Sequence, residues 1–153
     1  MNYEIPSSIR QEHEALHDRL RQATQVDGEV GESAKALARL MHPHFMKEDR
    51  IAMPPLGLLA ALAGGDATPE MAGVLELTDQ LEADLPSMLA EHKTIVEAPQ
   101  RLRDAAQRAG RAEIVDFAQQ LIHHARAEEE VMYPAAILVG KFVRERLHGR
   151  GST

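Results

Sequence analysis

The chain contains the same short pattern twice, and this duplication limits what it can fold into. A histidine is followed four residues later by a glutamate at His44 and Glu48, and again at His124 and Glu128. Each copy continues with an acid, an aliphatic residue and a proline: Asp49, Ile51 and Pro54, then Glu129, Val131 and Pro134. A single histidine precedes each copy, His13 in the first half and His92 in the second. We therefore predict one domain over residues 1–153, with two related units at about residues 9–63 and 81–147.

The composition favours helices over sheets. Apolar residues make up 44% of the 153 residues, but aromatic residues only 3%, and tryptophan is absent. The core must therefore consist of Leu, Ala, Ile, Val and Met, and this mixture is more typical of helices than of a β-sandwich. We predict an all-α protein.

Charge, cysteine content and hydropathy exclude several classes of function. The net charge of −7 argues against a nucleic acid as the main partner. There is no cysteine, so thiolate ligands and a nucleophilic thiol are excluded. The N-terminal residues lack the pattern of a signal peptide, and no apolar run approaches the ~18 residues that span a membrane. We expect a cytoplasmic protein that does not bind membranes.

Prolines and glycines divide the chain into predicted helices. Long helices are expected over about residues 7–24, from 29 or 33 to 53, over 68–97 and over 112–132, and shorter ones over 56–63, 100–109 and 135–147. Pro86 lies inside the third long helix and predicts a kink. Four long helices with short links predict an up-down four-helix bundle. The short helices after each repeat are expected to cover one end of the bundle or to form a subunit contact.

Each long helix places a histidine on its apolar face. At about 100° per residue, the histidines fall among aliphatic and aromatic neighbours. The predicted faces are Ile9, His13, Leu16 and Leu20; Leu37, Leu40, Met41, His44, Glu48 and Ile51; Leu81, Leu85, Met88, His92 and Ile95; and Phe117, Leu121, His124, Glu128 and Met132. His42 and His123 point away from these faces and His148 lies near the end of the chain, so we expect all three on the surface.

The six buried polar residues indicate a metal site. One histidine on an apolar face is usually a hydrogen-bonded core residue, but four histidines and two glutamates are costly to bury without a cation. Residues four apart share a helical face, so each His–Glu pair can reach one point. Imidazole and carboxylate ligands suit iron, manganese or zinc. Six ligands in two related halves suit two ions about 3.5–4 Å apart, bridged by Glu48 and Glu128.

The order His, His-x-x-x-Glu, His, His-x-x-x-Glu resembles the hemerythrin-like family of HHE cation-binding domains. The resemblance covers about residues 9–132. It implies a di-iron centre with an oxo or hydroxo bridge. It also implies six iron ligands: His13, His44, Glu48, His92, His124 and Glu128.

The chain departs from the oxygen carriers of that family, which use five histidines, two of them four residues apart on the third helix. Here Val96 stands one turn after His92, whereas His17 stands one turn after His13. One hypothesis is that His17 supplies the fifth imidazole; the alternative is a histidine at the rim of the bundle. We expect Asp49, Glu129 and Glu130 to face solvent or to support the ligands. Tyr133, beside the end of the last ligand helix, could reach the pocket, but we expect it to serve in packing.

Three functions are compatible with such a site, and we expect no protein nucleophile in any of them. The first is a module that binds or senses O2, NO or iron. The second is an enzyme that consumes hydrogen peroxide at an open iron position. The third is a purely structural metal. The partner is thus expected to be a diatomic molecule or peroxide, and the protein a monomer or homodimer.

Overall fold

The computed structural model describes residues 3–149, and this part of the chain is helical without strands. The prediction of an all-α protein is confirmed. The four long helices are α1 (Ser7–Thr24), α2 (Glu29–Lys47), α4 (Val74–Arg108) and α5 (Ala112–Ala127). The other elements are η1 (Glu48–Ala52), η2 (Pro54–Leu58), α3 (Leu59–Ala63), η3 (Pro69–Gly73), η4 (Glu128–Met132) and α6 (Tyr133–Gly149).

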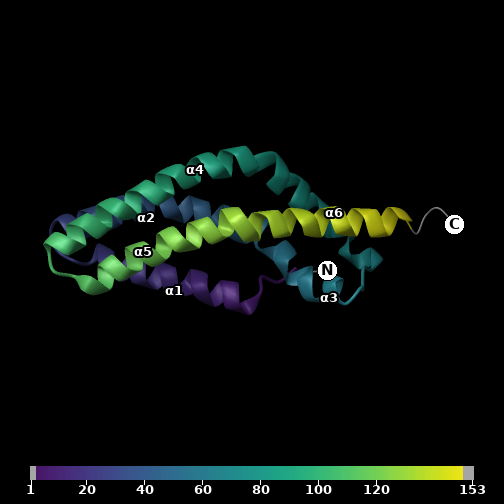
Figure 1. Ribbon diagram of the computed structural model, residues 1–153, viewed down its shortest axis with the longest axis horizontal. Helices are drawn as coiled ribbons and strands as arrows, with labels where there is room; N and C mark the ends of the chain where they lie inside the picture. Colours follow the sequence, from purple (N-terminus) through teal and green to yellow (C-terminus); the bar gives the residue numbers. More distant parts are fainter. Residues whose placement is uncertain (1–2, 150–153) are drawn as a thin grey trace.

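The four long helices form a bundle (Figure 1). Helix α1 packs on α2, α2 on α4, α4 on α5, and α5 on α1. The loop between α1 and α2 and the turn between α4 and α5 lie at the same end of the bundle, on the left in Figure 1. Each connection contains a glycine with positive φ, 82° at Gly28 and 69° at Gly110. Glycine adopts this conformation without steric cost, and it lets the chain reverse within a few residues.

The bundle contains two apolar cores separated by the polar residues of the duplicated pattern. The first core fills the end near the two turns and includes Leu20, Leu37, Leu102 and Phe117. The second lies on the other side of the polar residues. Its buried members are Ile51, Ala52, Met53, Leu56, Leu81, Met88, Tyr133 and Ala136. Leu40 was predicted to face the core but is 39% exposed, because it lies on the rim of the α2 face.

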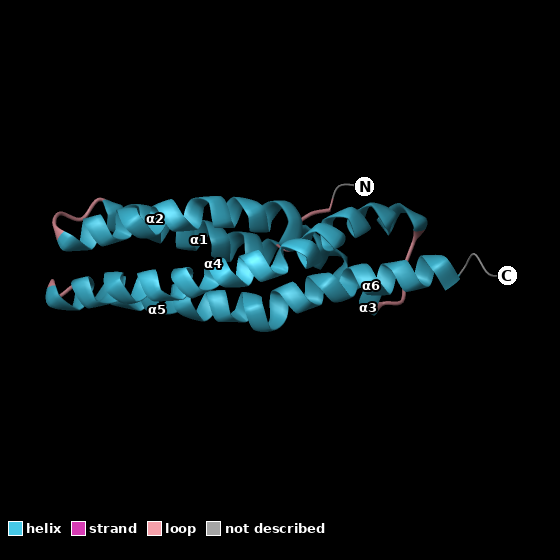
Figure 2. Cartoon of the chain, turned by 90° about the horizontal axis from the view of Figure 1, so that it is seen from above, coloured by secondary structure: helices cyan, strands magenta, loops and turns pink. Residues whose placement is uncertain are grey.

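The segments after the two prolines are helical, as predicted. After Pro54 the chain forms η2 and α3, and after Pro134 it forms α6. Helices α5, η4 and α6 follow one continuous line in both views (Figures 1 and 2). Leu58, Leu62, Val139 and Val143 form a third apolar cluster, which covers the end of the bundle opposite the turns. A subunit contact through this end stays a prediction.

The predicted boundaries around α4 were wrong. Residues 69–73 form the 3₁₀ turn η3, so α4 begins at Val74 rather than at Thr68. Helix α4 then continues through Pro86 and Pro99 to Arg108, where two helices had been predicted. A proline removes one backbone hydrogen bond, but packing on both sides can hold a helix together across it. Figure 1 shows α4 bent within its first half, which contains Pro86.

No helix among residues 3–149 is both long and apolar enough to cross a lipid bilayer.

Candidate metal centre

Two π-helical turns present the glutamates of the duplicated pattern. Glu48 begins η1 and Glu128 begins η4. In each turn, the backbone N–H five residues later, from Met53 or Tyr133, donates to the glutamate carbonyl. A π turn contains one residue more than an α turn, and such turns often occur at functional sites. The extra residue brings position i+5, rather than i+4, back to the face of the glutamate.

The six residues of the predicted site converge inside the bundle. Each histidine comes from a different long helix, and the glutamates come from η1 and η4. All six are buried, with at most 4% of their surface exposed. These residues are His13, His44, Glu48, His92, His124 and Glu128. Sequence periodicity therefore placed each of them on the correct face.

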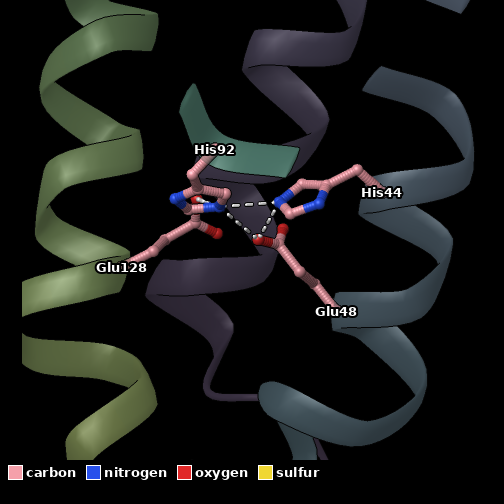
Figure 3. Close-up of side chains that lie close together, drawn as sticks. All are labelled: His44, Glu48, His92 and Glu128. Carbon is pink, nitrogen blue, oxygen red and sulfur yellow. Dashed lines mark hydrogen bonds and ion pairs between the residues drawn. The ribbon is translucent and has the colours of Figure 1, made fainter. Parts of the chain in front are cut away.

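Four of these residues form one group, which we call the His44 group (Figure 3): His44, Glu48, His92 and Glu128. The Nε2 atoms of His44 and His92 are 2.8 Å apart. Oε1 of Glu48 lies 2.7 Å from Nε2 of His44 and 3.7 Å from Nε2 of His92. Oε1 of Glu128 lies 3.8 Å from Nε2 of His92. This clustering of donor atoms is compatible with a shared cation.

A second group, the His13 group, comprises His13, His124 and Glu128. Here the two Nε2 atoms are 3.0 Å apart. Oε2 of Glu128 lies 3.6 Å from Nε2 of His13 and 3.4 Å from Nε2 of His124. Oε2 of Glu48 also lies near this group, 3.9 Å from Nε2 of His13.

Each glutamate therefore directs one oxygen toward each pair of histidines. The Oε1 atoms of Glu48 and Glu128 face His92, and their Oε2 atoms face His13. Both Oε2 atoms are buried and accept no hydrogen bond from the described part of the chain. An unsatisfied buried carboxylate oxygen is destabilising, and a cation beside both atoms would remove that cost.

In each of the four clustered histidines, the second ring nitrogen, Nδ1, contacts a carboxylate at the edge of the bundle. The Nδ1 atoms of His13 and His92 contact the acid that follows each glutamate, Asp49 at 3.2 Å and Glu129 at 3.0 Å. The Nδ1 atoms of His44 and His124 contact the acid that precedes each single histidine. The distances are 2.9 Å from His44 to Glu91 and 2.7 Å from His124 to Glu12.

These outer contacts determine which nitrogen is free. An Nδ1–H that donates to a carboxylate leaves the lone pair on Nε2, and the Nε2 atoms all point inward. Two lone pairs about 3 Å apart repel each other unless a proton or a cation lies between them. The outer carboxylates thus fix the histidines in the form that binds metal.

Sequence reasoning had identified Asp49 and Glu129 as possible supporting residues but missed Glu12 and Glu91. The signal was present, because an acid directly precedes the single histidine in both halves. Glu130, considered together with Glu129, is exposed.

Tyr133 belongs to the same cluster. Its side chain is fully buried, and its hydroxyl donates a short hydrogen bond to Oε1 of Glu48. The hydroxyl oxygen also lies 3.0 Å from Nε2 of His92 and 3.4 Å from Nε2 of His44. Tyr133 therefore reaches the pocket, which was the alternative to the packing role expected for it. The π turn had not been predicted, and it turns Tyr133 inward.

The charges of the buried carboxylates control the pKa values of the histidines. Burial alone would lower the pKa of His44, but hydrogen bonds to Glu48 and Glu91 and the charge of Glu48 raise it to about 9. Burial would also lower the pKa of His124, but Glu128 and Glu12 raise it to about 9. The ion-pair partners of Glu48 and Glu128 within residues 3–149 are all histidines. The site is therefore built to attract positive charge.

The pKa values of the two buried carboxylates, Glu48 and Glu128, shift in opposite directions. Burial would raise the pKa of Glu48, but hydrogen bonds from His44 and His92 bring it well below its usual range. Burial and the charge of Glu48 raise the pKa of Glu128. Two carboxylates this close are easier to ionise together when cations lie between them.

His17 lies outside both groups. It is partly exposed, and its ring packs on Phe45 with centroids 4.2 Å apart. Its packing on Phe45 favours a histidine at the rim of the bundle, the alternative to a fifth imidazole ligand, and the ligand hypothesis stays a prediction. His42, His123 and His148 are exposed, as predicted.

The fold and the cluster define a class of protein: a helical bundle with a buried group of histidines and glutamates that could hold metal ions. The family model of the hemerythrin HHE cation-binding domain matches residues 4–136. The chain belongs to this family. No curated protein and no solved structure matches the chain at a significant level.

Proposed function

We propose that the cluster holds two iron ions bridged by Glu48 and Glu128. One ion is assigned to His44 and His92, and the other to His13 and His124. The observation that carries the proposal is the division of each carboxylate, with one oxygen toward each pair of histidines. The buried Oε2 atoms without hydrogen-bond partners also support it. We assign the four long helices to the up-down order of this family.

The residues of the chain would bind and orient the ions rather than react themselves. Four neutral imidazoles present Nε2, and the outer carboxylates keep each proton on Nδ1. The absence of thiolates and the mixture of imidazole and carboxylate suit iron better than copper. When bound, iron would supply the redox chemistry and an open coordination position.

We further propose that the site binds or senses a diatomic molecule, O2 or NO. The donor atoms are buried by all four long helices, so only a small molecule would reach them. Hydrogen peroxide is comparably small, and its consumption at the same site is the second candidate function.

Iron loading tests the first part of this proposal. Protein purified from its own host, and protein reloaded anaerobically with ferrous iron, should each contain two irons per chain. Glu48→Ala should lose at least one of them, whereas Glu130→Ala, which changes an exposed acid, should retain both. Two tightly bound zinc ions in host-purified protein, or equal iron content in both variants, would contradict a carboxylate-bridged di-iron site.

Ligand binding is tested on the loaded protein. Reversible changes in the visible spectrum on aeration, or on addition of NO or azide, are expected for a binding or sensing module. Rapid oxygen evolution from peroxide, lost in Glu48→Ala, would instead assign the enzymatic function. A spectrum that none of these molecules alters would contradict both functions.

A further inference from the structure

The two halves of the metal centre differ in the residue that lies five positions after each bridging glutamate. Met53 and Tyr133 occupy the same place in the duplicated pattern, directly before the proline and five residues after the glutamate. The backbone N–H of each donates to that glutamate, and both side chains are fully buried. The phenol of Tyr133 thus has a thioether as its counterpart.

The phenol oxygen lies among the donor atoms of the His44 group. Donor atoms that bind one ion at ~2.1 Å and at right angles to each other are about 3.0 Å apart. The hydroxyl oxygen of Tyr133 is 3.0 Å from Nε2 of His92 and 3.4 Å from Nε2 of His44. The distance between the two Nε2 atoms is 2.8 Å. The oxygen therefore lies at the spacing expected of an additional ligand.

We propose that Tyr133 binds, through its phenolate oxygen, the ion held by His44 and His92. This inference rests on the proposed di-iron site. On metal loading the O–H bond of Tyr133 breaks, its electron pair stays on the oxygen, and the proton is released to solvent. Phenolate is a hard oxygen ligand of the kind that ferric iron prefers.

In the absence of metal the phenol keeps its proton and donates it in a hydrogen bond to Glu48. A cation in the His44 group reverses the sign of the local charge, and it favours the phenolate as it favours a thiolate or hydroxide bound to a metal.

The two pairs of histidines are consequently unequal. Tyr133 would add an oxygen ligand at the pair of His44 and His92, whereas the equivalent residue of the other half, Met53, carries a soft thioether that suits Cu(I) rather than iron. The ring of Phe45 lies 5.2 Å from the ring of His13, so the pair of His13 and His124 has an apolar neighbour. A small ligand such as O2, NO or azide would be expected on that side.

Resonance Raman and visible spectroscopy of the ferric protein test this assignment. The wild-type protein should show a phenolate-to-iron charge-transfer band and tyrosinate ring modes that shift when the protein is grown with ring-deuterated tyrosine. Tyr133→Phe should lose both signals. The matched control is Tyr3→Phe, because the chain has only two tyrosines and Tyr3 donates to the carbonyl of Glu70, far from the cluster. This control should keep both signals.

The outcomes separate the inference from the proposed function. A wild-type protein with two irons but no tyrosinate signal, or a Tyr133→Phe protein that keeps the signal, overturns the tyrosine ligand and leaves the di-iron site intact. A wild-type protein that does not bind two irons overturns both. The measurement on labelled wild-type protein decides the question even if Tyr133→Phe fails to fold or to hold iron.

Discussion

At the scale of single residues, the outer carboxylates connect the two halves of the chain. Glu12 of the first half contacts His124 of the second, and Glu91 of the second half contacts His44 of the first. Asp49 contacts His13 within its own half. Each carboxylate that contacts an imidazole is the sequence neighbour of another member of the cluster. A small shift of one helix therefore also moves the partner of a histidine on another helix.

The contact between Glu129 and His92 gives a direct test of this support. Glu129→Ala removes the acceptor for Nδ1 of His92, and loss of such a partner typically weakens metal binding about 10–100-fold. Competition with a coloured chelator measures the affinity. Glu130→Ala is the control, because Glu130 is the next residue but is exposed. Equal affinities in the two variants would show that the outer carboxylate does not hold the imidazole in place.

His13 and His17, one turn apart on α1, should respond differently to truncation. His13→Ala removes a donor atom of the His13 group and should lower the bound metal below two ions per chain. His17→Ala removes a ring that packs on Phe45 and should leave the metal content and the visible spectrum unchanged. Metal analysis and absorption spectra compare the two variants. A lower metal content or an altered spectrum in His17→Ala would show that His17 is a ligand.

At the scale of helices, periodicity predicted the four histidine faces because each α-helix repeats every 3.6 residues. It failed where the helix departs from that repeat. With α-helical spacing, Met132 follows Glu128 on the same face, and it was predicted there. The π turn η4 holds one extra residue and places Tyr133 on that face instead. No residue type in Glu128–Met132 marks a π turn, so the sequence could not predict it.

The ends of α4 could not be predicted for a related reason. Proline usually ends a helix, and the prediction followed that rule at Pro99. Pro99 is buried inside α4, where packing against the neighbouring helices compensates for the missing hydrogen bond. Tertiary contacts of this kind are not visible in the local sequence.

The contact between α4 and α6 gives a prediction for helix packing. A Cβ atom added at Gly140 of α6 would lie 2.6 Å from Cβ of Thr78 on α4 and 2.1 Å from its Oγ1. Gly140→Ala should therefore force the helices apart and lower the free energy of unfolding by about 1–3 kcal/mol. Urea denaturation measures the change. Gly149→Ala, with open space around the added atom, should be close to neutral. A Gly140→Ala protein as stable as wild type would show that α6 does not pack closely on α4.

At the scale of the whole molecule, a layer of polar groups divides the apolar interior in two. Along α2 and η1, the first core ends at Phe45 and the second begins at Ile51, with Glu48 between them and His44 directly before Phe45. The same order holds from α5 through η4 to the start of α6, where Ala125 and Tyr133 belong to different cores and Glu128 lies between them. The layer must remain electrically balanced for the two cores to join in one bundle. Metal ions would provide this balance, and protons provide it in protein stripped of metal.

This balance predicts how the stability of metal-free protein changes with pH. The folded-state pKa values of His44 and His124 are about 9, above the unfolded value of 6.5. Folding therefore favours their protonated forms. The stabilisation is fully present below pH 6.5 and is lost as the pH rises through about 9. For chelator-treated protein, the urea midpoint should accordingly fall between pH 6.5 and pH 9.5.

Metal-loaded protein is the control for that experiment. Bound ions keep the imidazoles neutral and take over the role of the protons, and a ligand that binds only the folded state stabilises it. The urea midpoint of iron-loaded protein should therefore exceed that of the stripped protein, and the difference should widen from pH 6.5 to pH 9.5. If stripped protein became more stable over this interval, the polar layer would not depend on positive charge, and protons could not be its substitute for metal.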